Sequence, residues 1–178
     1  MLPLTIDNEQ LLNQEAPVVT NLEELKILAN NYERLSGKVV TIQGITIRRN
    51  ICDLFHKITF YGKLKLICFN NCNIRSDSIP VFRDISCSFA VNNCNLTADT
   101  AEDILRSLDP YAAVDADLSN NNLGGEGFDQ LLKYIKDVVS AGIQGFSSLN
   151  LTNNGINEKD IEDLKEFIKT EKYSAITI

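Results

Sequence analysis

The feature that most constrains this fold is a short string that recurs along the chain. Aligned on its second apolar position, it reads apolar-x-apolar-x-x-Asn/Cys-x-apolar. The four clear copies are Ile67/Phe69/Cys72/Ile74, Phe89/Val91/Cys94/Leu96, Ala116/Leu118/Asn121/Leu123 and Leu149/Leu151/Asn154/Ile156. Weaker copies flank them at Val40/Ile42/Ile45/Ile47 and at Ile176/Ile178. The second apolar positions, 42, 69, 91, 118, 151 and 178, are separated by 27, 22, 27, 33 and 27 residues. This spacing predicts a repeat protein whose units stack on their neighbours.

Each copy of the string predicts a very short strand followed by a bend. Two apolar residues separated by one residue place their side chains on the same, inward face of a strand. The Asn or Cys then lies where the backbone turns away, and its side chain can bond to main-chain groups that the bend leaves unpaired. Ile45 has no such group, so the first copy is predicted to be a weaker, terminal unit.

The spacers between the copies carry helical patterns. In residues 157–172, apolar side chains recur at three- and four-residue intervals, and Asn157 is available to begin the helix. Residues 124–142 and 97–108 repeat the pattern, and residues 51–61 show it more weakly. The spacer after Ile74 is the shortest and contains Pro80, so it should hold only a brief, irregular helix.

This alternation predicts an α/β fold in which parallel strands line one side of a curved stack and every helix lies on the outer side. Residues 1–36 differ, because they read as two helices joined near Pro17. We interpret them as an N-terminal helical cap over the open end of the stack. Residues 37–178 then form one continuous domain of about five repeats and a terminal strand.

The string L-x-L-x-x-N/C-x-L, followed by a helix in a unit of about 27 residues, resembles the ribonuclease-inhibitor type of leucine-rich repeat. The resemblance covers about residues 37–178 and implies a solenoid with a short parallel sheet on its concave face and helices on its convex face. It also implies a non-enzymatic module that binds another protein and inhibits or modulates it, without a cofactor. Short, Asn-rich arrays of this kind are also similar to effectors that intracellular bacteria inject into host cells, or to proteins that regulate such effectors.

The partner-binding face follows from the period of two within each strand. If Ile67 and Phe69 point inward, their neighbours point to the concave side. The candidate binding residues are Leu66, Cys68, Asn70, Ser88, Ala90, Asn92, Asp115, Asp117, Ser119, Asn150 and Thr152. The same rule places Val39, Thr41, Gln43, Ser148 and Thr177 on this face. The face is polar with an acidic point, which favours a basic or hydrogen-bonding loop; the alternative is a merely solvated strand face. Tyr111 is either an aromatic anchor at its rim or a packing residue beneath a loop.

Charge and hydropathy favour a protein partner. The formal net charge is −7 with a pI near 4.7, which argues against nucleic acid or anionic lipid as the main ligand. The first residues lack a signal peptide, and no stretch reaches the roughly 20 apolar residues of a membrane span. These features predict a cytoplasmic protein, which would act in the host cytosol if it is a bacterial effector, and no membrane insertion.

Several residues that could have indicated chemistry have simpler explanations. His56 is the single histidine and has no fixed acid or nucleophile near it in sequence, so an ordinary helix position is favoured over catalysis. Zinc at Cys68-x3-Cys72 with Cys87-x6-Cys94 would need unusually loose ligand spacing. Free thiols are therefore expected, although a Cys72–Cys94 disulfide is conceivable in an oxidising medium. The glycines at 124, 125 and 127 favour a turn over a phosphate loop, because Glu126 lies among them and no Lys-Ser/Thr follows.

Two alternatives to an inhibitory binding module remain open. A regulator of a small GTPase would place an exposed arginine near the strand ends, and Arg48, Arg49 and Arg75 do follow predicted strands. A passive adaptor would use the same face without inhibiting its partner.

Overall fold

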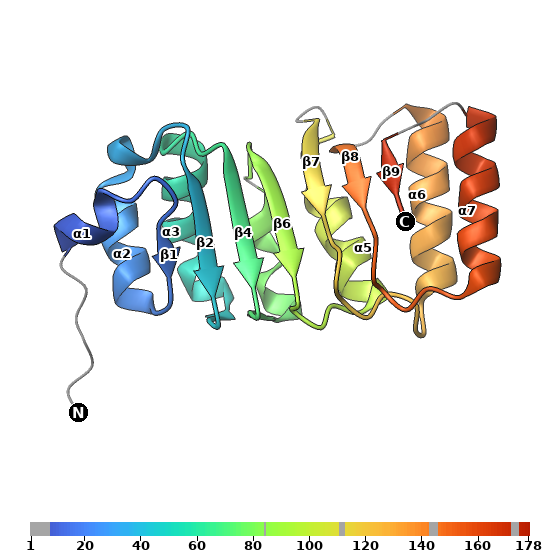
Figure 1. Cartoon of the computed structure of the whole chain (residues 1–178), viewed down its shortest axis with the longest axis horizontal. Coiled ribbons are helices and arrows are strands. Elements are labelled where there is room, and N and C mark those ends of the chain that lie inside the picture. Colours follow the sequence, from blue (N-terminus) through green and yellow to red (C-terminus); the bar gives the residue numbers. More distant parts are fainter. Residues whose placement is uncertain (1–7, 84, 111–112, 143–145, 172–174) are drawn as a thin grey trace.

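The chain folds into an α/β structure around a parallel seven-stranded sheet (Figure 1). The computed structural model describes residues 8–83, 85–110, 113–142, 146–171 and 175–178. The sheet consists, in spatial order, of β1 (Val18–Val19), β2 (Val39–Gln43), β4 (Leu66–Asn70), β6 (Ser88–Asn92), β7 (Val114–Asp117), β8 (Phe146–Asn150) and β9 (Ile176–Thr177). A second, parallel pair consists of β3 (Thr46–Ile47) and β5 (Asn73–Ile74). The predicted α/β class with parallel strands is confirmed.

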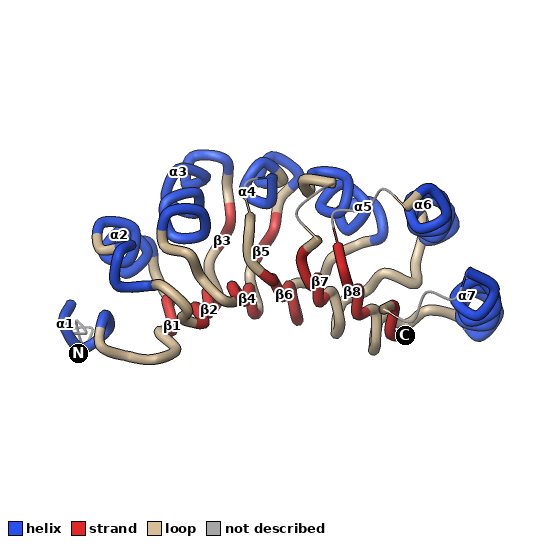
Figure 2. Tube along the Cα trace, turned by 90° about the horizontal axis from the view of Figure 1, so that it is seen from above, coloured by secondary structure: helices blue, strands red, loops and turns tan. Residues whose placement is uncertain are grey.

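The helices lie on one side of the sheet. They are α1 (Asn8–Leu12), α2 (Leu22–Asn30), α3 (Cys52–His56), α4 (Pro80–Arg83), α5 (Ala98–Ser107), α6 (Phe128–Ala141) and α7 (Glu158–Glu171), with short 3-10 turns η1 (Tyr32–Leu35), η2 (Arg49–Ile51) and η4 (Ser76–Ser78) and a π-helical turn η3 (Lys57–Tyr61). Figure 2 shows the strands along the inner side of a shallow arc and α2 to α7 along its outer side. One face of the sheet is therefore left open.

The strands keep the alternation that the sequence predicts. In β4, Ile67 and Phe69 are fully buried, whereas the residues between and beside them are partly exposed. β2 shows the same pattern, with Val40 and Ile42 inside. Neighbouring strands pair so that equivalent residues lie opposite one another, as Ile67 does with Phe89. The inward positions of the repeat therefore form continuous rows across the core.

The bend residues bond in the way that the string predicts. Three of the four bend side chains accept a hydrogen bond from the N–H of the bend residue in the preceding copy: Asn154 from Asn121 at 3.1 Å, Asn121 from Cys94 at 3.0 Å, and the Cys94 sulfur from Cys72 at 3.3 Å. All four bend side chains also donate to the carbonyl of the second apolar residue in the preceding copy. The bonds run from Asn154 to Leu118 at 3.0 Å, Asn121 to Val91 at 2.7 Å, Cys94 to Phe69 at 3.5 Å and Cys72 to Ile42 at 3.3 Å. The Asn and Cys positions thus form one ladder that joins the copies.

The residue just before each bend position shares a backbone conformation that the repeat string did not predict. Gly44, Asn71, Asn93, Asn120 and Asn153 all have left-handed backbone angles, with φ between 51° and 69°. Only glycine and, to a lesser extent, asparagine adopt this conformation at low cost. This explains why the repeats are rich in Asn immediately before Cys72, Cys94, Asn121 and Asn154, a signal that was present in the sequence.

The N-terminal segment differs from the expected pair of helices. Val18 and Val19 form a parallel edge strand beside Thr41 and Ile42 of β2, and the Thr41 N–H donates to the Pro17 carbonyl. Two β-branched residues favour this extended conformation. The helix then begins after Asn21, whose side chain accepts a hydrogen bond from the Glu24 N–H at 3.0 Å. The segment that covers the first repeat is thus partly strand.

The core changes character along the stack. In the first half, Phe55, Phe69, Phe82 and Phe89 are buried in a chain of ring contacts with centroids 5.4 to 5.9 Å apart. In the second half, the core is mostly aliphatic, with Leu118, Leu131 and Ile135 fully buried, and it includes two buried phenylalanines, Phe128 and Phe146. The α4 helix has only four residues, as expected for the spacer with Pro80, and its Phe82 ring packs between Phe69 and Phe89.

Candidate functional site

The open face of the sheet is the candidate site, and its side chains form three rows across the strands. The first row is Val39, Leu66, Ser88, Asp115 and Ser148; the second is Val18, Thr41, Cys68, Ala90, Asp117, Asn150 and Thr177; the third is Gln43, Asn70 and Asn92. Ser119 and Thr152 lie two residues after the ends of β7 and β8, beside this third row. The register thus brings the predicted binding residues together on one surface, which we call the open face.

Asp115 is held by hydroxyl groups from both neighbouring strands. Its carboxylate accepts hydrogen bonds from Ser148 Oγ at 2.6 Å, Ser147 Oγ at 2.7 Å and Ser88 Oγ at 3.3 Å. The bonds from Ser148 and Ser147 lower the pKa of Asp115 below its ordinary value of 3.8. The side chain is therefore a fixed negative charge at the exposed edge of the first row.

Asp117 carries a second oriented carboxylate in the next row. Its Oδ1 accepts from the Ser119 N–H at 2.9 Å and from Asn92 Nδ2 at 3.3 Å. Asn92 Nδ2 also donates to Ser119 Oγ at 3.1 Å, so Asp117, Asn92 and Ser119 form one network. Because Asp115 and Asp117 are two residues apart on β7, both carboxylates lie on the same side of the strand.

A hollow of about 360 Å³ lies beside the two carboxylates. Its walls include Lys65, Leu66, Ser88, Asp115, Asp117 and Asn150, and Ala90 lies in its floor. Ala90 has the smallest side chain in the second row, between Cys68 and Asp117, and this leaves the depression. The hollow therefore combines an apolar floor with an acidic wall on β7 and one lysine just before β4.

The open face becomes less polar toward β2. Val39, Thr41, Leu66 and Cys68 are half-buried there, and none carries a charge. Burial, together with the negative charge of Asp117, raises the pKa of the Cys68 thiol. Cys68 is therefore protonated at neutral pH and is a weak nucleophile.

Two of the predicted binding residues offer little surface of their own. Ala90 and Ser119 are only 6% and 5% exposed. Ala90 is shielded by its larger neighbours, and the Ser119 hydroxyl accepts hydrogen bonds from Asn92 and Asn120. Their contribution is to shape the hollow and to hold Asp117. The possible rim anchor, Tyr111, lies outside the described residues.

Comparison with known proteins identifies no relative. No protein-family model matches the chain, and no curated protein matches it either. The site must therefore be judged on its own geometry.

The residues considered for chemistry are placed as follows. All five cysteines are free thiols. Within the described ranges no group of three His, Cys, Asp or Glu side chains is arranged to hold a metal ion, and no helix is long and apolar enough to cross a membrane. The His56 ring stacks on Phe60 with centroids 5.2 Å apart. Gly124 lies in a turn so close to the Gly155 carbonyl that a Cβ would stand 2.1 Å from the oxygen, which explains the glycine.

The three arginines at the strand ends lie on the opposite side of the bend. Arg48 and Arg75 follow β3 and β5, which are paired, so they occupy adjacent positions. Both are exposed, as is Arg49, and Arg75 Nε lies 3.9 Å from Asp77 Oδ1. None of the three belongs to the open face.

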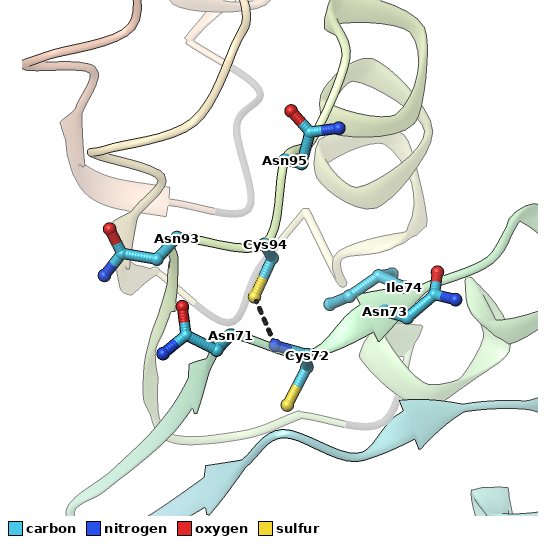
Figure 3. A pocket seen from close by; sticks show the side chains of 7 residues that line it. All are labelled: Asn71, Cys72, Asn73, Ile74, Asn93, Cys94 and Asn95. Carbon is cyan, nitrogen blue, oxygen red and sulfur yellow. Dashed lines mark hydrogen bonds between the residues drawn. The ribbon is translucent and has the colours of Figure 1, made fainter.

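A second hollow, of about 400 Å³, was not predicted from the sequence. It is lined by Asn71, Asn73, Asn93 and Asn95 around the Cys72–Cys94 contact (Figure 3). It lies where the β3–β5 pair ends, because Asn95 has a left-handed φ of 52° and does not continue the extended backbone of Asn73. This hollow is a consequence of the bends, and its amide groups show no arrangement specific to one ligand.

Proposed function

We propose that this protein is a leucine-rich-repeat solenoid that binds another protein through the open face and thereby inhibits or modulates it. The repeat string with its bend ladder supports the ribonuclease-inhibitor-type assignment. The parallel sheet with helices on one side is the architecture that this assignment requires.

The observation that carries the proposal is the hollow between β4 and β8. It offers apolar area at Leu66 and Ala90 beside two oriented carboxylates. Asp115 and Asp117 are already fixed by hydrogen bonds, so little ordering is needed when a partner binds. Such a surface suits a protein loop that presents a basic side chain with an aliphatic stem, such as arginine or lysine.

The proposal can be tested by affinity capture. Tagged wild-type protein and Asp117→Arg are used as baits, and captured proteins are identified by mass spectrometry. We expect Asp117→Arg to lose the partner, because it reverses a charge at the centre of the face, while thermal unfolding changes little at this partly exposed position.

Asp137→Arg on the exposed side of α6 is the matched control, and it should capture the partner normally. Capture by Asp117→Arg at the wild-type level would contradict the proposal. Equal loss of capture and of thermal stability in Asp117→Arg would instead indicate that the fold was damaged.

A further inference from the structure

A group of aromatic side chains lies at the surface away from the open face. We call Tyr32, His56, Phe60 and Tyr61 the aromatic patch. Phe60 and Tyr61 lie in η3, between α3 and the start of β4. Each is 53% exposed, more than any other large hydrophobic side chain that the structure describes. Neighbouring exposed rings of this kind are typical of protein interaction sites.

The four rings form one packed group. The His56 and Phe60 rings stack at 5.2 Å, and Tyr61 stands edge-on to both, with centroids 5.4 Å and 5.2 Å away. Tyr32, from η1, lies 5.8 Å from Tyr61. These contacts hold Phe60 and Tyr61 in place while half of each ring remains at the surface, so a partner would meet a preformed apolar surface.

Two lysines flank the aromatic patch in the chain. Lys57 begins η3 and Lys63 follows it before β4, and both are exposed. Lys65 is also exposed, but it lines the hollow of the open face and belongs to that surface. Neither Lys57 nor Lys63 forms an ion pair within the described part of the chain. They belong to a basic segment, because residues 34–83 contain nine Lys or Arg and two Asp and have a net charge of +7. The net charge of the whole chain, −7, does not reveal this local excess.

Ring orientation argues against a single-stranded nucleic acid on this surface. Successive bases of a bound strand stack on aromatic faces. The planes of Phe60 and Tyr61 are 88° apart, so the two rings cannot both stack on neighbouring parallel bases. One face of Phe60 is also covered by His56 at an interplanar angle of 9°. The chemistry fits a shorter anionic partner with apolar side chains.

We infer that the aromatic patch and its two lysines form a second docking surface, for an acidic protein segment that carries apolar or aromatic side chains. The apolar side chains of that segment pack on Phe60 and Tyr61, and its carboxylates pair with Lys57 and Lys63. The aromatic contact supplies most of the affinity, and the lysines supply fast, salt-sensitive association. The open face, with its acidic wall, receives the opposite kind of partner.

The inference can be tested by fluorescence anisotropy with a labelled peptide in which glutamates alternate with leucine and phenylalanine. We expect saturable binding to the full chain that weakens as salt is raised. Phe60→Ala should weaken binding by about tenfold or more, because exposed aromatic anchors dominate such contacts. The combined reversal Lys57→Glu and Lys63→Glu should abolish it.

The matched control reverses two exposed lysines elsewhere, Lys133→Glu and Lys159→Glu, and should bind the peptide as the wild type does. Asp117→Arg should also retain the peptide, which separates this surface from the open face. The inference is wrong if the peptide does not bind, if both double reversals weaken binding equally, or if an oligothymidine binds more tightly than the peptide. It is also wrong if light scattering shows that the protein alone forms dimers that Lys57→Glu with Lys63→Glu dissociates, since the occupant would then be a second copy.

Discussion

The two halves of the stack build the same backbone frame from different chemistry. In the first half, Cys72 and Cys94 occupy the bends, phenylalanines fill the core, and α3 and α4 have five and four residues. In the second half, Asn121 and Asn154 occupy the bends, the core is mostly aliphatic with Phe128 and Phe146 as separate buried rings, and α5, α6 and α7 have 10, 14 and 14 residues. The bend requires a side chain that both accepts and donates hydrogen bonds, which Asn and Cys can each do. The core requires side chains of sufficient volume, which aromatic and aliphatic residues can both supply.

The difference also concerns the strength of the bonds. Asn121 makes three donated and two accepted hydrogen bonds, at 2.7 to 3.2 Å. The Cys94 thiol donates at 3.2 and 3.5 Å and accepts at 3.3 Å, and sulfur is a weak donor and acceptor. The first half must therefore depend more on its aromatic core, and the second half more on its ladder.

The largest expected effect is the loss of an aromatic ring from the first half. Phe82→Ala should lower the free energy of unfolding by about 3–5 kcal/mol, because the ring is fully buried between Phe69 and Phe89 and the α4 helix is too short to collapse into the cavity. Urea denaturation checks this. A loss below about 1 kcal/mol would contradict the claim that the aromatic core stabilises the first half.

A smaller effect is expected at the ladder of the second half. Asn154→Ala should lower the free energy of unfolding by roughly 1–3 kcal/mol, because it removes the acceptor of the Asn121 N–H and the side-chain donor to the Leu151 carbonyl. Asn154→Cys should recover part of the loss, since a thiol fills this role at Cys94. A change within error for Asn154→Ala would contradict the structural role of the bend residue.

The corresponding change in the first half should cost less. Cys94→Ala removes only the long, weak bonds to the Phe69 and Asn92 carbonyls and from Cys72, so we expect a loss of about 1 kcal/mol. The measurement is again urea denaturation, beside Asn154→Ala. If Cys94→Ala cost more than Asn154→Ala, the proposed difference between the two halves would be wrong.

The smallest effect concerns pH. Because the folded-state pKa of Asp115 is lowered, its carboxylate adds stability above the ordinary value of 3.8, and this contribution disappears as the pH falls through the folded-state pKa. Asp115→Asn should therefore lower stability at pH 7 by less than about 1 kcal/mol, since the site is exposed. Thermal melting from neutral to acid pH should show the two proteins converging at low pH. A difference in melting temperature that grew as the pH fell would contradict this prediction.

The features that recur at a regular spacing were predicted from the sequence, whereas features that involve only a few residues were not. The repeat string located the strands, the bend ladder and the helix that starts after Asn157, because each depends on side chains at fixed spacing. It did not separate the strand at Val18–Val19 from the helix after it, because two residues carry too little periodicity. Asn at 71, 93, 120 and 153 could have revealed the left-handed positions.

The candidate site shows the same division. The period of two assigned the open face correctly as a surface, yet the hollow depends on the small Ala90 lying between Cys68 and Asp117, which only the register reveals. The aromatic patch was missed because it brings Tyr32 to a π-helical turn far along the chain, and because the overall negative charge concealed a basic segment. Both depend on tertiary neighbours.

The most direct test of the central claim is carboxyl footprinting by mass spectrometry on the complex with the captured partner. A carbodiimide-coupled amine label modifies accessible Asp and Glu side chains. We predict that the partner protects Asp115 and Asp117 on the open face, while Glu162 and Asp163 on the exposed side of α7 remain modified to the same extent as in the free protein. Protection of α7 with unchanged labelling of Asp115 and Asp117 would contradict binding through the open face.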